Sequence, residues 1–228
     1  MHRMDQRILL IGGSRGIGLA AAEHLVVRAE SIWCVSRSPS PYGKWVQADV
    51  GTPEGIEHVV TTLAAERLDA LLYLGGTWED GAFTSAYSFE NSHREELDRI
   101  LAVNLAAPIK LVHGLLPALR RSSNPRVLLI GSLSGLDNAA SREVANSASK
   151  YGLRGAAQAL AKEAPDVPVT VINPGNVATL EVESDIVAGR FAKQTPIPLT
   201  DLLATIDYAL ALSPASFAAE INLAQTNG

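Results

Sequence analysis

Short apolar runs alternate with longer amphipathic segments from one end of the chain to the other. The runs are rich in Val, Ile and Leu and short enough for buried strands, whereas the longer segments have the three-to-four-residue spacing of helices. We predict strands over Arg7–Ile11, Ser31–Ser36, Trp45–Ala48, Ala70–Leu74, Arg126–Ile130, Val167–Ile172 and Glu220–Leu223. Helices are expected over Gly16–Arg28, Pro53–Glu66, Glu95–Arg121, Val144–Lys162 and Asp201–Leu212, the last with Thr200 as its N-cap.

This alternation is typical of an α/β fold. It predicts a doubly wound, seven-stranded parallel sheet with helices on both faces, in a single domain that spans residues 1–228. Pro108 and Pro117 should bend or interrupt the long third helix. Gly75–Asn91 and Thr179–Leu199 have no regular period, and each follows the carboxyl end of a strand. Because ligands bind at that edge of open α/β sheets, we expect these two segments to form the substrate loops.

Composition limits the classes of partner. A chain of 228 residues with 47% apolar residues can bury a sizeable core. Its net charge of -5, without basic clusters, makes nucleic acid an unexpected partner. The first six residues carry charge where a signal peptide needs an apolar segment, and no later stretch gives eighteen uninterrupted apolar residues. We therefore expect a cytoplasmic protein without membrane attachment.

Cysteine and histidine usage argues against a metal site. Cys34 is the only cysteine and lies inside an apolar run, which favours a buried, unreactive thiol. The five histidines have no helical i, i+4 partner and no cysteine or histidine close in sequence. No metal ligand set is predicted.

A glycine-rich turn joins the first predicted strand to the first helix. It reads Gly12-Gly13-Ser14-Arg15-Gly16-Ile17-Gly18, with the spacing G-x-x-x-G-x-G. Glycines allow a sharp turn and the close approach of a pyrophosphate, and the free N–H groups of the following helix favour an anion. We assign cofactor phosphate binding to Gly12, Ser14, Arg15, Gly16, Ile17 and Gly18. A glycine turn without a ligand remains the alternative.

The end of the second strand indicates which dinucleotide binds. A site for NAD places Asp or Glu there to accept from the ribose hydroxyls, but this chain has Ser36-Arg37. A guanidinium can pair with the 2′-phosphate of NADP, and Arg15 can supply a second cation. NADP(H) is therefore predicted over NAD(H), unless Arg37 is only a solvated loop cation.

Together these motifs resemble the short-chain dehydrogenase/reductase family, whose fold is of the Rossmann type. Beyond the glycine turn, four further matches follow in the family's order between Arg7 and about Thr179. Asp49-Val50 matches the residues that contact the adenine, Asn104 the structural and catalytic asparagine, Ser132 the catalytic serine, and Pro174, Gly175, Val177 and Thr179 the segment that cradles the nicotinamide amide.

The chain departs from the family at two places. The family's N-N-A-G reads Tyr73-Leu74-Gly75-Gly76 here, which keeps a small turn for the cofactor but loses the asparagine side chains. The family's catalytic tyrosine, four residues before Lys150, is replaced by Asn146. In the family the tyrosine exchanges the carbonyl proton, the lysine lowers the tyrosine pKa and holds the ribose, the serine polarises the carbonyl and the asparagine positions a relay water. A carboxamide donates hydrogen bonds but is no acid at neutral pH.

No other residue takes the place of the tyrosine in the sequence. Tyr151 follows Lys150 directly, so its side chain points roughly 100° away from the Asn146/Lys150 face of the helix. Four further candidates are expected to be structural, since spacing alone does not bring them to the substrate: Tyr73, Tyr87, His93 and Glu143.

Several functions fit this pattern. The first is an NADPH-dependent reductase that polarises a small-molecule carbonyl with Ser132 and Asn146, while water or the substrate supplies the proton. The second is a pseudoenzyme that binds NADP(H) without turnover, and the third is non-redox chemistry such as cyclisation or elimination. Asn146 could also be an engineered replacement for tyrosine. The resemblance further implies a homodimer or homotetramer, paired through the helices Glu95–Arg121 and Val144–Lys162.

Overall fold

All seven strands lie in one parallel sheet. The computed structural model describes residues 5–191 and 193–226, so four of the six residues that argue against a signal peptide lie outside it. The strand order is β3-β2-β1-β4-β5-β6-β7. The strands are β1 (Arg7–Ile11), β2 (Ser31–Ser36), β3 (Lys44–Gln47), β4 (Ala70–Tyr73), β5 (Arg126–Ile130), β6 (Val169–Pro174) and β7 (Glu220–Leu223). This order reverses between β1 and β4, which confirms the predicted doubly wound fold and places a ligand crevice at that point.

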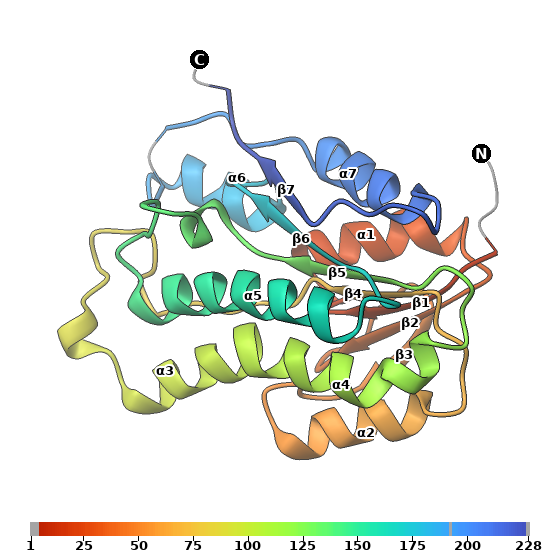
Figure 1. Cartoon of the computed structure of the whole chain (residues 1–228). Helices are drawn as coiled ribbons and strands as arrows, with labels where there is room; N and C mark the ends of the chain where they lie inside the picture. Colours follow the sequence, from red (N-terminus) through yellow and green to blue (C-terminus); the bar gives the residue numbers. More distant parts are fainter. Residues whose placement is uncertain (1–4, 192, 227–228) are drawn as a thin grey trace.

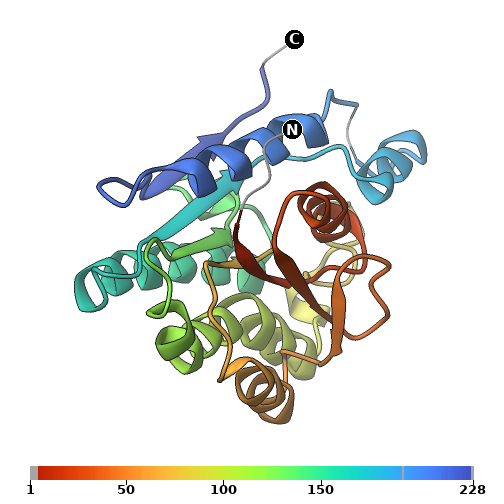
Figure 2. The same cartoon turned by 90° about the vertical axis from the view of Figure 1, so that its right-hand side faces the viewer.

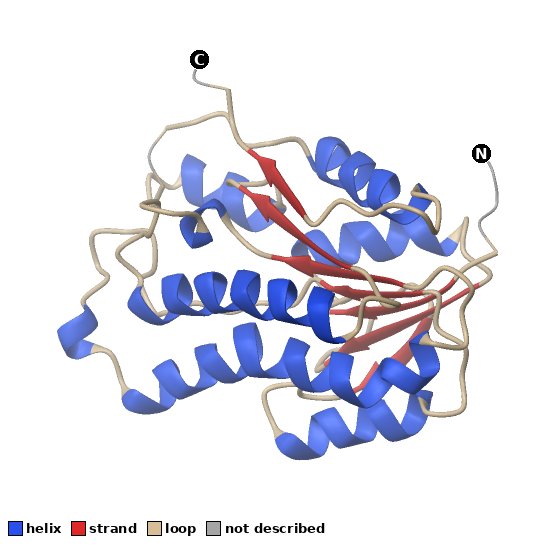
Figure 3. Cartoon of the chain, in the orientation of Figure 1, coloured by secondary structure: helices blue, strands red, loops and turns tan. Residues whose placement is uncertain are grey.

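Helices cover both faces of the sheet (Figures 1 and 3). They are α1 (Gly16–Val26), α2 (Pro53–Leu63), α3 (Arg94–Leu101), α4 (Ala107–Leu119), α5 (Val144–Glu163), α6 (Leu180–Val187) and α7 (Leu199–Ala211). Figure 2 shows α1 and α7 on one side of the sheet and α2, α4 and α5 on the other. The amino end of α5 and the substrate-loop segments lie at the carboxyl edge of the strands, on the left in Figure 1.

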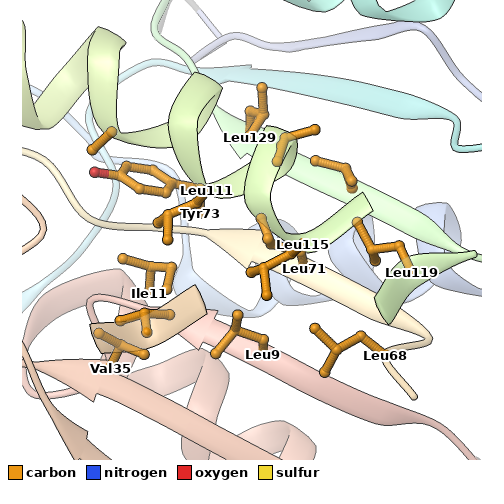
Figure 4. Close-up of a cluster of buried hydrophobic side chains, with 14 of the residues drawn as sticks. Leu9, Ile11, Val35, Leu68, Leu71, Tyr73, Leu111, Leu115, Leu119 and Leu129 are labelled. Carbon is orange, nitrogen blue, oxygen red and sulfur yellow. The ribbon is translucent and has the colours of Figure 1, made fainter. Parts of the chain in front are cut away.

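Two apolar cores hold the layers together. Residues that alternate along each strand point to opposite faces, so Leu9 and Ile11 pack toward α2, α4 and α5, while Ile8 and Leu10 pack toward α1 and α7. Figure 4 shows the first core, in which Leu111, Leu115 and Leu119 of α4 lie over the sheet at helical spacing. Cys34 is fully buried in the second core, and burial raises the pKa of its thiol. The buried, unreactive cysteine of the sequence prediction is thereby supported.

The predicted third helix is interrupted as expected, but not at both prolines. A π-helical turn at Ala102–Ala106 separates α3 from α4, whereas Pro117 lies inside α4. Pro108 has no N–H to donate to the carbonyl four residues earlier, that of Asn104, and a wider turn accommodates this loss. The composite helix Arg94–Leu119 is long and apolar enough to cross a membrane by those two criteria, but it packs against α2, α5 and the sheet. It is a core helix of this fold.

Some predicted boundaries were wrong. β3 begins and ends one residue earlier than predicted, β4 ends one residue earlier, and β6 runs two residues later because it pairs with β7 as far as Pro174. Pro198, not Thr200, is the N-cap residue of α7, so Thr200 lies inside that helix. The helices α1 and α2 end two and three residues before their predicted ends.

The helix α6 was not predicted. The Thr179 hydroxyl caps it by accepting a hydrogen bond from the Val182 N–H at 3.3 Å. None of its residues is buried, and Leu180 and Val187 are exposed. Without a buried face the segment has no apolar period, and it therefore resembled an irregular loop.

Candidate active site

The glycine turn and the β4 turn fit together backbone to backbone. Gly12 has φ +97°, and a Cβ there would lie 2.8 Å from the Gly75 Cα. A Cβ on Gly18 would lie 2.0 Å from the Gly12 carbonyl oxygen. These contacts require glycine at Gly12 and Gly18.

Gly16 leaves a cradle that has room for a phosphate and is bounded on one side by the Glu181 carboxylate. Its φ is +53°, and a Cβ there would meet only the Glu181 carboxylate, at 3.9 Å. Arg15 is the exposed N-cap residue of α1, and Ser14 and Ile17 flank the turn with partly exposed side chains. With no acidic residue in its first turn, α1 presents N–H groups and a positive dipole end to this space. The residues present therefore fit a dinucleotide pyrophosphate.

Two unpaired guanidinium groups lie beside this turn. Arg37 follows β2 and is exposed, as is Arg15. Within residues 5–191 and 193–226, neither guanidinium has a carboxylate within salt-bridge distance. The Ser36 hydroxyl donates a hydrogen bond to the Ser38 carbonyl at 2.7 Å, which orders the backbone that carries Arg37. Both cations can thus meet an anionic ligand, and Arg37 also lies close enough to Asp49 to lower the pKa of that carboxyl.

Asp49 already has partners in the protein. Its carboxylate pairs with Arg99 at 2.8 Å and accepts from the Gly51 N–H at 2.9 Å. Burial raises the pKa of the Asp49 carboxyl, but the Arg99 and Gly51 hydrogen bonds outweigh it, so the net pKa is lowered. Val50 packs against the core. Arg99 is a neighbour of the predicted adenine site that sequence reasoning missed, because it lies 50 residues farther along, on α3.

Ser132 has its own hydroxyl proton available. It is the N-cap of a short 3-10 helix, Leu133–Gly135, and its Oγ accepts hydrogen bonds from the Ser134 N–H at 3.1 Å and the Ser134 hydroxyl at 2.9 Å. An oxygen that accepts twice turns its own O–H away from both donors. Ser132 is therefore arranged to donate to an acceptor such as a carbonyl oxygen.

Lys150 is buried on the same helix, one turn after Asn146. Its Nζ donates to the Ile130 carbonyl at 3.0 Å, and burial lowers the pKa of the ammonium to about 8. Asn146 is also buried. Its backbone N–H and carbonyl are hydrogen-bonded, but its side-chain carboxamide has no hydrogen-bond partner among the described residues. The α5 face thus offers an ammonium with free donors and an unengaged amide.

Asn104 acts as a clamp in this structure. Its Oδ1 accepts from the Thr77 N–H at 2.9 Å and its Nδ2 donates to the Thr77 carbonyl at 2.7 Å. The paired bonds tie the π-helical turn to the segment that begins at Gly75 and Gly76. The carboxamide is largely used in this way, so the structure gives Asn104 a structural contact and leaves its proposed water-positioning role untested.

The segment after β6 reaches the same edge of the sheet. Pro174 ends β6 and pairs with Leu223, and the Gly175 N–H donates to the Leu223 carbonyl at 2.9 Å. Val177 is buried and forms a bridge with Ile197, and Thr179 starts α6. The predicted nicotinamide segment therefore lies at the carboxyl edge of the sheet, with α6 leading from it over the glycine turn.

The tyrosines have structural contacts. Tyr73 is buried, its hydroxyl donates to the Val103 carbonyl at 2.5 Å, and burial raises its pKa well above the usual range. The Tyr151 hydroxyl donates to the Leu136 carbonyl, and the Tyr87 hydroxyl accepts from the Val144 N–H at 3.2 Å. Glu143 is likewise occupied, because its Oε1 accepts from the Phe83 N–H at 2.7 Å. The hydroxyl protons of Tyr73 and Tyr151 are thus used within the fold, and Tyr87 and Glu143 accept from the backbone at the amino end of α5 and from the Phe83 N–H.

Sequence reasoning also missed Glu79, which is almost fully buried at the amino end of α5. Its Oε1 accepts from the N–H groups of Ala145 at 2.8 Å and Asn146 at 3.1 Å. Its Oε2 is buried without a partner among the described residues. The positive end of the α5 dipole stabilises this carboxylate, which in turn fixes the backbone of the first turn.

Comparison with known proteins identifies the class. Residues 6–186 match the short chain dehydrogenase family. The chain is 28% identical to the short-chain dehydrogenase/reductase olcF of Penicillium canescens over 187 residues, covering 77% of this chain and 70% of that one. It belongs to the short-chain dehydrogenase/reductase family.

Solved structures agree on the fold. A short chain dehydrogenase family protein from Francisella tularensis superposes with a TM-score of 0.81 at 18% identity, covering 97% of this chain and 98% of that one. A metagenomic short-chain oxidoreductase, solved with NADP, gives 0.76 at 22% identity and covers 98% of each chain. The family binds a nicotinamide cofactor and acts on small molecules.

Proposed function

We propose that the protein is an NADP(H)-dependent reductase of a small-molecule carbonyl, with Asn146 in place of the proton-donating tyrosine. The observation that carries this proposal is the set of unengaged donors at one edge of the sheet. The Ser132 O–H, the Asn146 amide and the Lys150 ammonium each have hydrogen-bonding capacity that no described residue uses. Such donors stabilise the negative charge that develops on a carbonyl oxygen during reduction.

The cofactor preference rests on charge. Arg15 and Arg37 leave two cations unpaired where an NAD site would have an acid, and each can pair with a 2′-phosphate. That a structural relative was solved with NADP agrees with this choice. The remaining cofactor contacts are those of the glycine turn, the Asp49-Val50 pair, Gly75-Gly76 and the Pro174–Thr179 segment.

When bound, NADPH supplies the hydride. Ser132 and Asn146 hold and polarise the carbonyl oxygen, and Lys150 holds the ribose and adds positive charge beside the site. Water or the substrate supplies the proton to the alkoxide oxygen. Loss of a positioned general acid removes about 10²–10⁴-fold of rate, which leaves a slow enzyme rather than an inactive one.

The experiment follows NADPH and NADH in parallel. We expect NADPH to bind at least about tenfold more tightly than NADH, a difference of about 1.4 kcal/mol, and Arg37→Asp to abolish that preference. We further expect NADPH oxidation when a panel of ketones is added. Equal affinity for the two cofactors in the wild type contradicts the NADP(H) assignment. Tight binding without oxidation would favour the pseudoenzyme, and product without oxidation the non-redox reading.

The remaining parts of the proposal concern the setting of the enzyme. We propose a cytoplasmic protein that acts as a homodimer or homotetramer, paired through the α3–α4 helix and α5. Leu101 and Ile109, on the composite helix, are each 38% exposed although apolar, which suits an interface.

A further inference from the structure

Three aromatic rings connect the two substrate-loop segments. Phe83, from the segment after β4, contacts Trp78 of the same segment edge to face, with ring centroids 6.2 Å apart. Phe83 also contacts Phe191, which follows α6, with centroids 6.0 Å apart and ring planes at 86°. We call Trp78, Phe83 and Phe191 the aromatic cluster. It joins segments that are more than 100 residues apart in sequence, so only the fold brings these rings together.

Two hydrogen bonds connect the segment that carries Trp78 and Phe83 to α5, the helix that bears Asn146 and Lys150. Trp78 directly precedes Glu79, whose carboxylate accepts from the Asn146 N–H at 3.1 Å. The Phe83 N–H donates to Glu143, the N-cap residue of α5, at 2.7 Å. Trp78 and Phe83 are therefore carried on backbone that is fixed against the first turn of α5, which bears Asn146, and Phe191 joins them through its ring contact with Phe83.

Two of the three aromatic residues are exposed although they are apolar, and Phe191 is partly exposed. Trp78 is 56% exposed and Phe83 is 42% exposed. Phe83 also has φ +64°, a backbone conformation that is rare for a residue with a large side chain. Exposed apolar surface next to a reaction site is typical of a ligand-binding surface, because burying it against an apolar ligand is favourable.

We propose that the aromatic cluster is the specificity-determining wall of the substrate site and that the substrate carries an apolar ring beside its reacting carbonyl. Aromatic rings pair edge to face or offset-stacked at centroid distances of 4.5–7 Å, so these rings can extend their own contacts to a substrate ring. The inference rests on the proposed reductase function only in that the carbonyl of the bound molecule is reduced. Binding of the ring itself follows from the cluster.

The test compares a ring-bearing ketone, 2-tetralone, with a small aliphatic one, 2-butanone. The variants are Phe83→Ala and Phe191→Ala, with Phe89→Ala as the matched control. Phe89 is 51% exposed in the same segment as Phe83 but makes no ring contact with the described residues. We expect kcat/KM for 2-tetralone to fall about tenfold in the two variants, mainly through KM, and that for 2-butanone to change less than about twofold. The control should behave as the wild type does.

Binding without turnover provides the second measurement. The phenol 2-naphthol has no hydrogen on its hydroxyl-bearing carbon and cannot give a hydride to NADP⁺, so its affinity for the NADP⁺-loaded protein reports binding without turnover. We expect 2-naphthol to quench tryptophan fluorescence in the wild type and Trp78→Phe to remove most of that quenching. Ring binding that is lost in the variants, without any NADPH oxidation in the wild type, would support the wall and contradict the reductase.

Three outcomes overturn the proposal. The first is equal loss of activity on both ketones, which would mean that the cluster only holds the two loops together. The second is 2-naphthol affinity that is unchanged in both Phe83→Ala and Phe191→Ala. The third is a lower molecular mass of the variants by light scattering, which would make the cluster an interface between copies of this chain. NADPH affinity, measured alongside, shows that each variant is folded.

Discussion

At the scale of single residues, the proposed chemistry depends on Asn146. It lies four residues before Lys150 and one helical turn away, so a tyrosine there would extend past the same face of α5. We expect Asn146→Tyr to raise ketone reduction by about 10²-fold or more, because a phenol near the Lys150 ammonium has its pKa brought toward neutrality. The pH–rate profile should gain a basic limb.

The contrary result for Asn146→Tyr is equally informative. A variant that folds and binds NADPH but gains nothing on any carbonyl would show that the site is adapted to the amide. Loss of a native activity would make Asn146 itself a catalytic residue. Tyr151→Phe is the matched control, since that hydroxyl is engaged by the Leu136 carbonyl and should not affect reduction.

The Lys150 pKa of about 8 predicts a pH dependence of stability. Burial lowers this pKa from an ordinary value of 10.5, so between pH 8 and 10.5 the unfolded chain holds a proton that the folded chain has released. The burial cost of the ammonium is therefore full below pH 8 and fades as the pH rises through that window. We expect Lys150→Met to stabilise the cofactor-free protein most at pH 7, and the gain to shrink toward pH 10.5 in urea unfolding. A constant difference across that range contradicts the buried ammonium.

The positions of the site residues that belong to family motifs could be predicted from the sequence, whereas the residues that contact them in the fold could not. Ser132, Lys150 and the glycines stand at fixed spacings from strands and helices, so the chain order located them. Glu79 lies 67 positions before Asn146 and reaches it only because the segment after β4 folds back over α5. No sequence pattern around Glu79 or Asn146 predicts the contact between them. The same holds for Arg99 beside Asp49.

At the scale of elements, the amino end of α5 depends on the segment after β4. That segment provides acceptors for the first three N–H groups of the helix, from Tyr87 and Glu79. Helix ends need such acceptors, and α5 lacks a side-chain cap of its own. The position of the first turn of α5 and that of the segment after β4 therefore depend on each other.

This dependence predicts how Glu79 variants behave. Glu79→Ala leaves two buried N–H groups without an acceptor and should cost about 1–3 kcal/mol of unfolding free energy. Glu79→Gln keeps a carbonyl oxygen in place of Oε1 and should lose less. Glu90→Ala, at an exposed site of the same segment, serves as the control. If Glu79→Ala unfolds at the wild-type denaturant midpoint, the capping role is wrong.

Strands that pack apolar side chains into the cores were predicted well, and a helix that buries none was not. The strands β1, β2 and β5 have their predicted bounds, because their buried apolar runs end where the chain leaves the sheet. The bounds of β7 were also predicted, although only Ile221 and Leu223 pack against the second core. The helix α6 has no buried residue, so its apolar positions follow no period. The apolar spacing also did not reveal the π-helical turn, because Pro108 changes the hydrogen bonding of the helix without changing that spacing.

At the scale of the whole molecule, the predicted association depends on the exposed side of α3–α4 and α5. On α5, Ala157 is buried and Leu160 packs against the protein's own core, so neither side chain is available to a partner helix. Gly155 instead faces open space, which permits close approach of a second helix. We expect light scattering at micromolar concentration to give two or four times the chain mass of 24.1 kDa. A mass near that of one chain contradicts the pairing, and Gly155→Leu should weaken it.

The central claim is hydride transfer at a site without the tyrosine. The most direct measurement is a single turnover of the wild-type protein with NADPH deuterated at the transferable position, in the presence of a panel of small and ring-bearing ketones. We predict deuterium on the former carbonyl carbon of the alcohol in amounts equal to the NADP⁺ formed, at a rate that Lys150→Met lowers. Bound NADPH that stays reduced with every ketone, or a product that contains no deuterium, contradicts the account.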